Sequence, residues 1–441
     1  MRTSPPASLS PTMVGNSPAQ SALARCFSSQ LAQVHGASTG FWQNARPKSS
    51  ATTPNSEPSA LESRNMNTRV LEALPVDLAD PTAILGDLED AISGKKTFLP
   101  IPVQDKTRAQ LLRDSQRVGL AIDPSIALVM ATSGSTGTPK GAQLTPLNLV
   151  SSADATHQFL GGEGQWLLAM PAHHIAGMQV LLRSLIAGVE PLAIDLSTGF
   201  HIDAFAGAAA ELKNTGDRVY TSLTPMQLLK AMDSLQGIEA LKLFDVILVG
   251  GAALSKQARI SAEQLDINIV TTYGSSETSG GCVYDGKPIP GAKVRISDER
   301  IELGGPMIAQ GYRNAPEHPD FANEGWFTTS DSGELHDGIL TVTGRVDTVI
   351  DSGGLKLHPE VLERAIADIK GVTAACVVGI PDPRLGQAIV AAYSGSISPS
   401  EVIEGLDDLP RWQLPKRLKH LESLPSIGPG KADRRAIAKL F

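Results

Sequence analysis

A loop rich in glycine and hydroxyl residues, from Thr132 to Gly141, is the segment of this sequence best suited to hold an anion. Its glycines let the backbone approach a ligand closely, its hydroxyls can donate hydrogen bonds, and Lys140 adds a positive charge. It differs from a Walker A loop because Lys140 is followed by Gly141 and Ala142 instead of Ser or Thr. The loop therefore predicts phosphate binding. The expected phosphate-binding residues are Thr132, Ser133, Gly134, Ser135, Thr136, Gly137 and Lys140.

The segments around this loop predict a strand before it and a helix after it. Residues 126–130 form a short apolar run, and Thr145 followed by Pro146 is typical of a helix start. A solvated linker is the alternative interpretation, but linkers seldom lie between a buried strand and a capped helix. Further strands are expected at residues 166–170, 192–196, 219–223 and 244–249, and a helix at 175–187 that ends at Gly188.

The alternation of short apolar runs with helical stretches predicts an α/β fold of helix-flanked β-sheets. Beyond Lys293 the pattern changes to hairpins, at residues 294–301 and, with Gly344 between its halves, at 339–349. A short α+β segment follows, with a helix at 359–369. The change predicts a large amino-terminal domain, residues 66–345, and a small α+β carboxy-terminal domain, residues 346–441.

Residues 1–65 have a different composition and predict a disordered, low-complexity extension. Roughly half of them are Ser, Pro, Ala or Thr, and no helical or strand period lasts a full element. Three interpretations compete: a transit peptide, a flexible tail, or upstream sequence before a true start at Met66. The start at Met66 is favoured, because patterned sequence begins there.

The charge balance indicates a small-molecule partner. The chain has 38 Lys and Arg against 46 Asp and Glu, a formal charge of -8. Residues 1–65 carry five basic and two acidic side chains, which leaves -11 for residues 66–441. This charge argues against a nucleic-acid partner or an anionic membrane surface, and no run of apolar residues is long enough for membrane insertion. The sequence leaves the oligomeric state open, with a homo-oligomer as one of the alternatives.

The three cysteines favour a reducing compartment, and hence the cytoplasm. Cys26, Cys282 and Cys376 are an odd number and lie too far apart in the chain for a metal-ligand pair or a disulfide framework.

A series of motifs beyond the phosphate loop resembles the adenylate-forming acyl-CoA synthetase superfamily. This group contains acyl-CoA and aryl-CoA ligases, luciferases and peptide-synthetase adenylation domains. Ser276 and Ser330 depart from its usual Thr and Gly, and the change at Ser330 affects the expected loop geometry. The matching segments are Pro171–Gly177, Thr272–Glu277, Gly325–Asp331, Gly344–Asp347, Gly353–Lys356 and Gly430–Lys431.

The resemblance implies activation of a carboxylic acid by ATP. A carboxylate is a poor electrophile, so these enzymes first form an acyl-adenylate with ATP and Mg²⁺, and many then transfer the acyl group to CoA. By resemblance, Lys431 contacts the carboxylate and the α-phosphate, Glu277 binds magnesium, and Asp331 binds the ribose. Further nucleotide contacts are expected at Gly251, Tyr273, Gly274, Ser276 and Arg345.

The superfamily also implies a mobile carboxy-terminal domain. Asp347 matches the hinge about which this domain rotates between the two half-reactions. For Lys431, which lies in a basic carboxy-terminal segment, the alternative is a solvated charge.

Three segments narrow the resemblance to o-succinylbenzoate-CoA ligases of menaquinone biosynthesis, in their short actinobacterial form: Tyr220–Leu228, Ile247–Ala252 and Ser279–Gly286. Their substrate is an aromatic dicarboxylate, so we expect an aromatic slot and a second anion partner. Arg183 is the candidate partner, although a structural ion pair is the alternative. The expected acid pocket comprises His174, Arg183, Ser222, Gly280 and Gly281. Alternative functions are another aryl- or acyl-CoA ligase, or an adenylation domain that loads a carrier protein.

Overall fold

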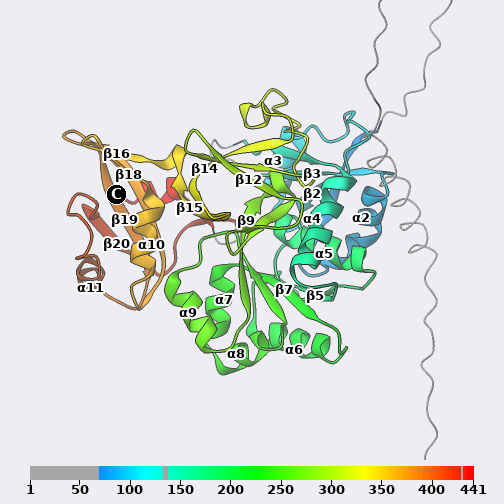
Figure 1. The fold of residues 1–441 in the computed structure, drawn as a ribbon, viewed down its shortest axis with the longest axis horizontal. Coiled ribbons are helices and arrows are strands. Elements are labelled where there is room, and N and C mark those ends of the chain that lie inside the picture. Colours follow the sequence, from blue (N-terminus) through cyan, green and yellow to red (C-terminus); the bar gives the residue numbers. More distant parts are fainter. Residues whose placement is uncertain (1–68, 133–137, 429–430) are drawn as a thin grey trace, which may run out of the picture. The chain divides into compact units, whose positions relative to one another are not determined.

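The structure is a computed structural model that describes residues 69–132, 138–428 and 431–441 (Figure 1). The predicted extension at residues 1–65 and five phosphate-loop residues, Ser133 to Gly137, lie outside these ranges. The described residues belong to one unit, Thr68–Phe441. Within them, no helix combines the length and apolar character needed to cross a bilayer.

The largest sheet has seven strands in the order β11-β10-β9-β8-β7-β5-β6. The five strands from β6 to β9 are parallel, whereas β10 and β11 are antiparallel to their neighbours. The strands are β5 (Gln165–Leu168), β6 (Leu192–Ala193), β7 (Val219–Leu223), β8 (Val246–Val249), β9 (Ile269–Ser275), β10 (Gly280–Tyr284) and β11 (Lys287–Pro288).

The helices that accompany this sheet bury an apolar core against it. Phe205, Leu228 and Phe244 belong to that core, together with Leu167 and Ile247 of the strands. The helices α6 to α8 lie together along β5 and β7 (Figure 1). The elements are α5 (Ile175–Ala187), α6 (Ile202–Lys213), α7 (Pro225–Met232), α8 (Leu235–Leu241), α9 (Lys256–Gln264) and the 3₁₀ helix η2 (Ser276–Thr278). The prediction that α5 ends at Gly188 is confirmed, because Gly188 has the left-handed conformation typical of a helix end.

A second sheet, in the order β1-β2-β3-β4, carries the predicted phosphate loop. The loop joins β3 to β4, and Ala131 pairs with Gly141 across this antiparallel pair. The helix predicted after the loop begins with a capping box between Thr145 and Asn148. A strand that the sequence analysis missed, β4, lies between loop and helix. The elements are β1 (Leu71–Val76), η1 (Pro81–Ile84), α2 (Leu85–Ile92), β2 (Thr97–Pro102), α3 (Lys106–Ser115), β3 (Leu128–Ala131), β4 (Gly141–Leu144) and α4 (Pro146–Phe159).

A third, antiparallel sheet corrects the expected hairpin around Gly344. Residues 339–345 form a single strand, β15, and its hairpin partner is the preceding strand β14. The reversal lies at Asp337 and Gly338, whose φ angles of 49° and 78° suit a two-residue hairpin turn. The elements are β12 (Lys293–Ser297), β13 (Arg300–Gly304), η3 (Pro319–Phe321), β14 (Trp326–His336) and β15 (Ile339–Arg345).

The carboxy-terminal segment has its own sheet and its own apolar core. Leu362 of α10 and Val377 and Ile389 of the sheet belong to that core, and α10 lies along β18 (Figure 1). The predicted domain boundary after residue 345 falls between β15 and η4, and it stays a prediction. The elements are η4 (Val346–Thr348), β16 (Ile350–Ser352), β17 (Leu355–Leu357), α10 (Pro359–Ala367), β18 (Val372–Asp382), β19 (Gly386–Gly395), α11 (Pro399–Glu404), β20 (Arg417–His420), β21 (Ser426–Gly428), β22 (Lys431–Ala432) and α12 (Arg434–Ala438).

Two helical glycines provide a test of this packing. A Cβ atom on Gly237 would lie against the backbone carbonyl of Ala231, far inside van der Waals contact, whereas a Cβ on Gly207 would meet open space. We expect Gly237→Ala to lower the free energy of unfolding by about 1–3 kcal/mol through overpacking. The control, Gly207→Ala in α6, should raise it by about 0.5–1 kcal/mol, because alanine favours a helix interior. Urea denaturation of both variants measures these changes, and equal effects would contradict the packing of α7 against α8.

Candidate active site

The carboxyl ends of the parallel strands bring several predicted residues to one edge of the seven-stranded sheet. His174 follows β5, Ser222 lies near the end of β7, Gly251 follows β8, and Tyr273 lies near the end of β9. In open parallel sheets this edge is where ligands bind. Ser222 and Gly251 are therefore at the expected edge of the sheet.

Glu277, the predicted magnesium ligand, is a buried carboxylate in η2 with 6% of its surface exposed. The hydroxyl of Tyr312 donates a hydrogen bond of 2.7 Å to its Oε1. Burial raises the pKa of Tyr312, so this hydroxyl keeps its proton and remains a donor. No cluster of three or more His, Cys, Asp or Glu suited to a metal occurs in the described part of the chain. The single carboxylate fits Mg²⁺, which commonly takes one or two carboxylates together with substrate phosphates and water.

Lys140, at the end of the phosphate loop, lies in a small polar network. Its Nζ is 3.3 Å from both Asp320 Oδ2 and His318 Nε2, and 4.3 Å from the centre of the Tyr312 ring. Tyr312 joins this network to Glu277, because its hydroxyl contacts both acids. The phosphate loop and the expected metal ligand are therefore linked through a tyrosine.

Asp331, Arg345 and Asp347 form a second charged group at the facing ends of β14 and β15. Asp331 and Arg345 are paired residues of the two strands, with 3.5 Å between Arg345 Nη1 and Asp331 Oδ1. The Arg345 guanidinium also makes two hydrogen bonds to Asp347, of 2.9 and 2.7 Å, which raise its pKa. Tyr273 donates to Asp331 Oδ2 at 2.7 Å. Burial raises the pKa of Asp331, and the bonds from Tyr273 and Arg345 oppose that shift.

Lys431 lies close enough to these groups to interact electrostatically with them. Removal of its ammonium from water lowers its pKa, while Glu277 and Asp331 raise it and Arg345 lowers it further. The side chain is solvent-accessible as a whole, but protein groups surround the ammonium. Lys431 also lowers the pKa of His174. One lysine of the carboxy-terminal segment thus interacts electrostatically with the predicted metal, ribose and acid-pocket residues.

His174 is the N-cap residue of α5 and is held neutral. Burial lowers its pKa to about 3, with smaller effects from His173, Lys431 and Arg108. Burial also lowers the pKa of the adjacent His173 to about 4, and the two rings lie 4.3 Å apart. Arg108 of α3, which the sequence analysis did not single out, reaches the start of the phosphate loop, with Nη2 3.5 Å from the Thr132 carbonyl oxygen.

Arg183 is buried, with 3% of its surface exposed, and pairs with no carboxylate among the residues that the structure describes. Its Nη2 lies 3.3 Å from the hydroxyl of Tyr284, and its guanidinium lies 4.9 Å from the ring of Trp166. Its Nε is buried without a hydrogen-bond partner. The described residues therefore give Arg183 no structural ion pair, which was the alternative interpretation.

The two pocket glycines, Gly280 and Gly281, permit close approach on β10. A Cβ on Gly280 would lie 3.2 Å from Gln179 Cγ, and one on Gly281 would lie 2.8 Å from the Tyr284 ring. Gly281 pairs with Gly274 of β9. Because Gly280 and Gly281 have no side chains, β10 can lie close to both α5 and the end of β9.

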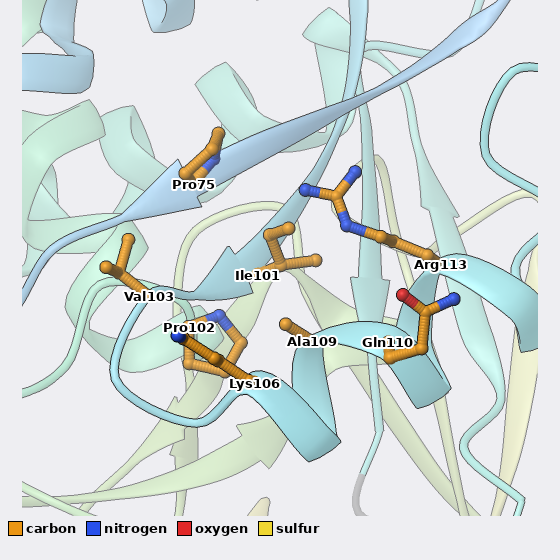
Figure 2. Close-up of a pocket in the computed structure, with 8 residues that line it drawn as sticks. All are labelled: Pro75, Ile101, Pro102, Val103, Lys106, Ala109, Gln110 and Arg113. Carbon is orange, nitrogen blue, oxygen red and sulfur yellow. The ribbon is translucent and has the colours of Figure 1, made fainter.

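A cavity of about 260 Å³ lies between α3 and the ends of β1 and β2 (Figure 2). It contains none of the residues that the sequence predicted for the site. Apolar residues from β1 and β2 line one side, and α3 contributes the longer polar side chains. The lining residues are Pro75, Ile101, Pro102, Val103, Lys106, Ala109, Gln110 and Arg113.

Comparison with known proteins identifies the family. The family described as AMP-binding enzyme matches residues 63–312, and the AMP-binding enzyme C-terminal domain matches residues 361–431. A probable 2-succinylbenzoate–CoA ligase of Mycobacterium tuberculosis is 41% identical over 382 residues, which cover 84% of this chain and 98% of that protein. The 2-succinylbenzoate–CoA ligase of Salmonella typhimurium is 30% identical over 83% of this chain and 78% of its own length.

Solved structures have the same fold. The o-succinylbenzoate CoA synthetase of Bacillus subtilis, in complex with an acyl-adenylate intermediate, matches with a TM-score of 0.72 and 20% identity, over 83% of this chain and 88% of that chain. Escherichia coli MenE with a bound analogue matches with a TM-score of 0.62 and 25% identity, over 84% and 88% of the two chains. The sequence-based α/β prediction, with a large amino-terminal and a small carboxy-terminal part, is confirmed. The chain belongs to the family of AMP-binding, adenylate-forming enzymes.

Proposed function

We propose that this chain is an ATP-dependent ligase that converts 2-succinylbenzoate to its CoA thioester in menaquinone biosynthesis. In the first half-reaction a substrate carboxylate oxygen attacks the α-phosphorus of ATP, and pyrophosphate leaves. In the second, the CoA sulfur attacks the acyl carbon, and AMP leaves. The relatives reported above support this reaction, because the mycobacterial protein matches over nearly its whole length.

Lys431 is proposed to be the cation of the first half-reaction. Negative charge accumulates on the α-phosphate and the attacking carboxylate, and an ammonium placed between them stabilises that charge. The electrostatic interaction of Lys431 with Glu277, Asp331 and His174 supports this role, because these residues belong to the proposed metal, ribose and acid sites.

The remaining nucleotide contacts are proposed from the same geometry. The Asp331 carboxylate can accept hydrogen bonds from ribose hydroxyls, with Arg345 beside it. Lys140 and the phosphate loop are proposed to hold the β- and γ-phosphates. Glu277 would hold Mg²⁺, whose charge would neutralise phosphate oxygens. Further proposed nucleotide contacts are Thr132, Gly251, Tyr273, Gly274 and Ser276.

Arg183 is the residue that supports a dicarboxylate as the acid substrate. It is a buried guanidinium without a carboxylate partner in the described structure, on the helix that begins at His174. Buried charges are normally paired, because an unpaired buried charge is strongly destabilising. A ring carboxylate of the substrate would supply the missing partner, while the succinyl carboxylate reacts. Ser222, Gly280 and Gly281 are proposed to complete this acid pocket.

The hinge and the location of the chain also belong to this proposal. Asp347 is proposed as the hinge between residues 66–345 and 346–441, and its two hydrogen bonds with Arg345 would rearrange when Lys431 leaves the site. Location in the cytoplasm is consistent with Cys282 and Cys376, which are both buried and free.

The reaction is tested with purified protein, ATP, Mg²⁺, CoA and a panel of carboxylic acids. We expect 2-succinylbenzoate to have a kcat/KM at least tenfold above those of benzoate and fatty acids. Only 2-succinylbenzoate has a second carboxylate to pair with Arg183, and one hydrogen bond to a charged group is worth about 10-fold or more. Pyrophosphate release and thioester mass measure the two half-reactions. Preference for another acid would overturn the substrate assignment, and pyrophosphate release without thioester would favour an adenylation domain.

Lys431→Ala separates the half-reactions. We expect adenylation to fall by about 10²- to 10³-fold, because one charge-stabilising contact is lost from the transition state. Conversion of preformed acyl-adenylate and CoA to thioester should be unchanged. Lys439→Ala, which removes an exposed lysine just after α12, is the control. Equal loss of both half-reactions in Lys431→Ala would contradict the proposed domain rotation.

His174 should not titrate in the working pH range. Its pKa is lowered from 6.5 to about 3, so it stays neutral as the pH falls from 8 to 5, where an ordinary histidine would gain a proton. The pH profiles of adenylation kcat/KM for the wild type and His174→Asn should therefore have the same shape, with His201→Asn as an exposed control. An inflection near pH 6.5 that disappears only in His174→Asn would show that the burial of this ring is wrong.

A further inference from the structure

Gln179 is a buried amide with no hydrogen-bond partner. It lies in α5 with none of its surface exposed, and neither Oε1 nor Nε2 has a hydrogen-bond partner in the structure. A primary amide offers two donors and two acceptor positions, and the large majority of buried side-chain polar atoms have at least one partner. An amide with all of them unused points either to a trapped water or to a ligand.

The position of Gln179 favours a ligand. Ile175, Gln179 and Arg183 are spaced by four residues and therefore form one row along α5. At one end of the row, Ile175 and Gln179 are the side chains nearest to a Cβ built on Gly280, and at the other, Arg183 contacts Tyr284. The row thus runs along β10 from Gly280 to Tyr284, within the proposed acid pocket.

Three unpartnered polar atoms lie in this row: Oε1 and Nε2 of Gln179, and Nε of Arg183. An isolated structural defect would leave one group unpaired, whereas these atoms are on neighbouring side chains and have complementary chemistry. Oε1 of Gln179 is an acceptor and Nε–H of Arg183 is a donor, and the Nε2 group of Gln179 offers two further hydrogens to an acceptor. A carboxylate at Arg183 supplies such an acceptor, since its oxygens accept several hydrogen bonds.

We propose that Gln179 determines specificity for the diacid by donating an Nε2 hydrogen bond to the substrate carboxylate that pairs with Arg183. This inference rests on the proposed function, because it requires an acid with a second carboxylate. Gly280 contributes by having no side chain: a Cβ atom there would lie 3.2 Å from Gln179 Cγ, so a larger residue would restrict the rotamer of the amide.

One substitution, Gln179→Leu, distinguishes a role in substrate binding from a purely structural role, because the proposal predicts opposite effects on thermal stability and on recognition of the diacid. Gln179→Leu removes an unsatisfied buried amide and keeps a side chain of similar size, so the acid-free protein should be at least as thermally stable as the wild type. The same change should weaken recognition of the ring carboxylate. A purely structural hydrogen bond through a trapped water predicts the reverse for stability.

The experiment measures kcat and KM of the wild type and Gln179→Leu for two acids. These are 2-succinylbenzoate and 4-oxo-4-phenylbutanoate, which has the same reacting arm and no ring carboxylate. For the diacid, Gln179→Leu should lower kcat/KM about 10- to 100-fold, mainly through KM, as expected for one hydrogen bond to a charged group. For the monoacid, kcat/KM should change little. Gln179→Glu, which adds a negative charge, should reduce the diacid reaction further.

Ser184→Ala is the matched control on the same helix. Ser184 is equally buried, and its hydroxyl is satisfied within α5 by the Val180 carbonyl, so this variant should affect both acids alike. Equal losses for both acids in Gln179→Leu, with a lower melting temperature, would overturn the proposal. Gln179→Met, unbranched and apolar, gives the same comparison if the leucine variant does not fold. A wild type without preference for the diacid would instead reject the proposed function.

Discussion

The electrostatic contact of Lys431 with Glu277 and Asp331 is the interaction on which the proposed chemistry depends. The three residues belong to β22, η2 and β14, in different sheets or connections of the chain. Desolvation lowers the pKa of Lys431, and the two carboxylates oppose that shift. Desolvation favours the neutral form of Lys431, whereas the two carboxylates favour its charged form. In the proposed reaction the phosphate would favour the charged form as well.

The acidic character of the chain makes this local arrangement necessary. With a formal charge of -8, the protein as a whole repels anions, yet the proposed substrates ATP, CoA and a dicarboxylate are all anionic. Positive groups are concentrated instead: Lys140 beside Asp320, Arg345 beside Asp331 and Asp347, and Lys431 within the electrostatic influence of Glu277. Each cation has a carboxylate neighbour, so these sites are close to neutral before a ligand binds and the cations are held in place. Arg183 differs from them, because it lacks such a carboxylate.

The sequence predicted the class of fold, because this depends on local patterns, and it proposed most of the residues of the candidate site. Short apolar runs and turn residues are enough to locate strands such as β7, and α5 was predicted with its correct limits. The second hairpin was misplaced, since Gly344 was interpreted as a turn while Asp337 and Gly338 form it. The roles of the site residues came from ordered motifs, and they remain proposals.

The residues that the sequence analysis missed are those whose importance arises only from tertiary contacts. Tyr312, Asp320 and Arg108 lie outside the recognised motifs, and each meets a predicted residue across more than 20 positions of sequence. Nothing in their local sequence distinguishes them from ordinary surface or core residues.

Two buried polar side chains of α5, Gln179 and Arg183, have atoms without hydrogen-bond partners. Gln179 and Arg183 lie on α5 beside the buried apolar residues Val180, Leu181 and Leu182, and the third buried polar side chain there, Ser184, is satisfied by the Val180 carbonyl. Leucine at either position would satisfy local helix propensity and burial equally well. An amide and a guanidinium there are expected to lower stability, a cost that the proposed function would explain because both groups would complete their bonds with the substrate. In the proposed complex, the second carboxylate of the substrate would accept the hydrogen bonds that Gln179 and Arg183 of α5 leave unused in the free protein.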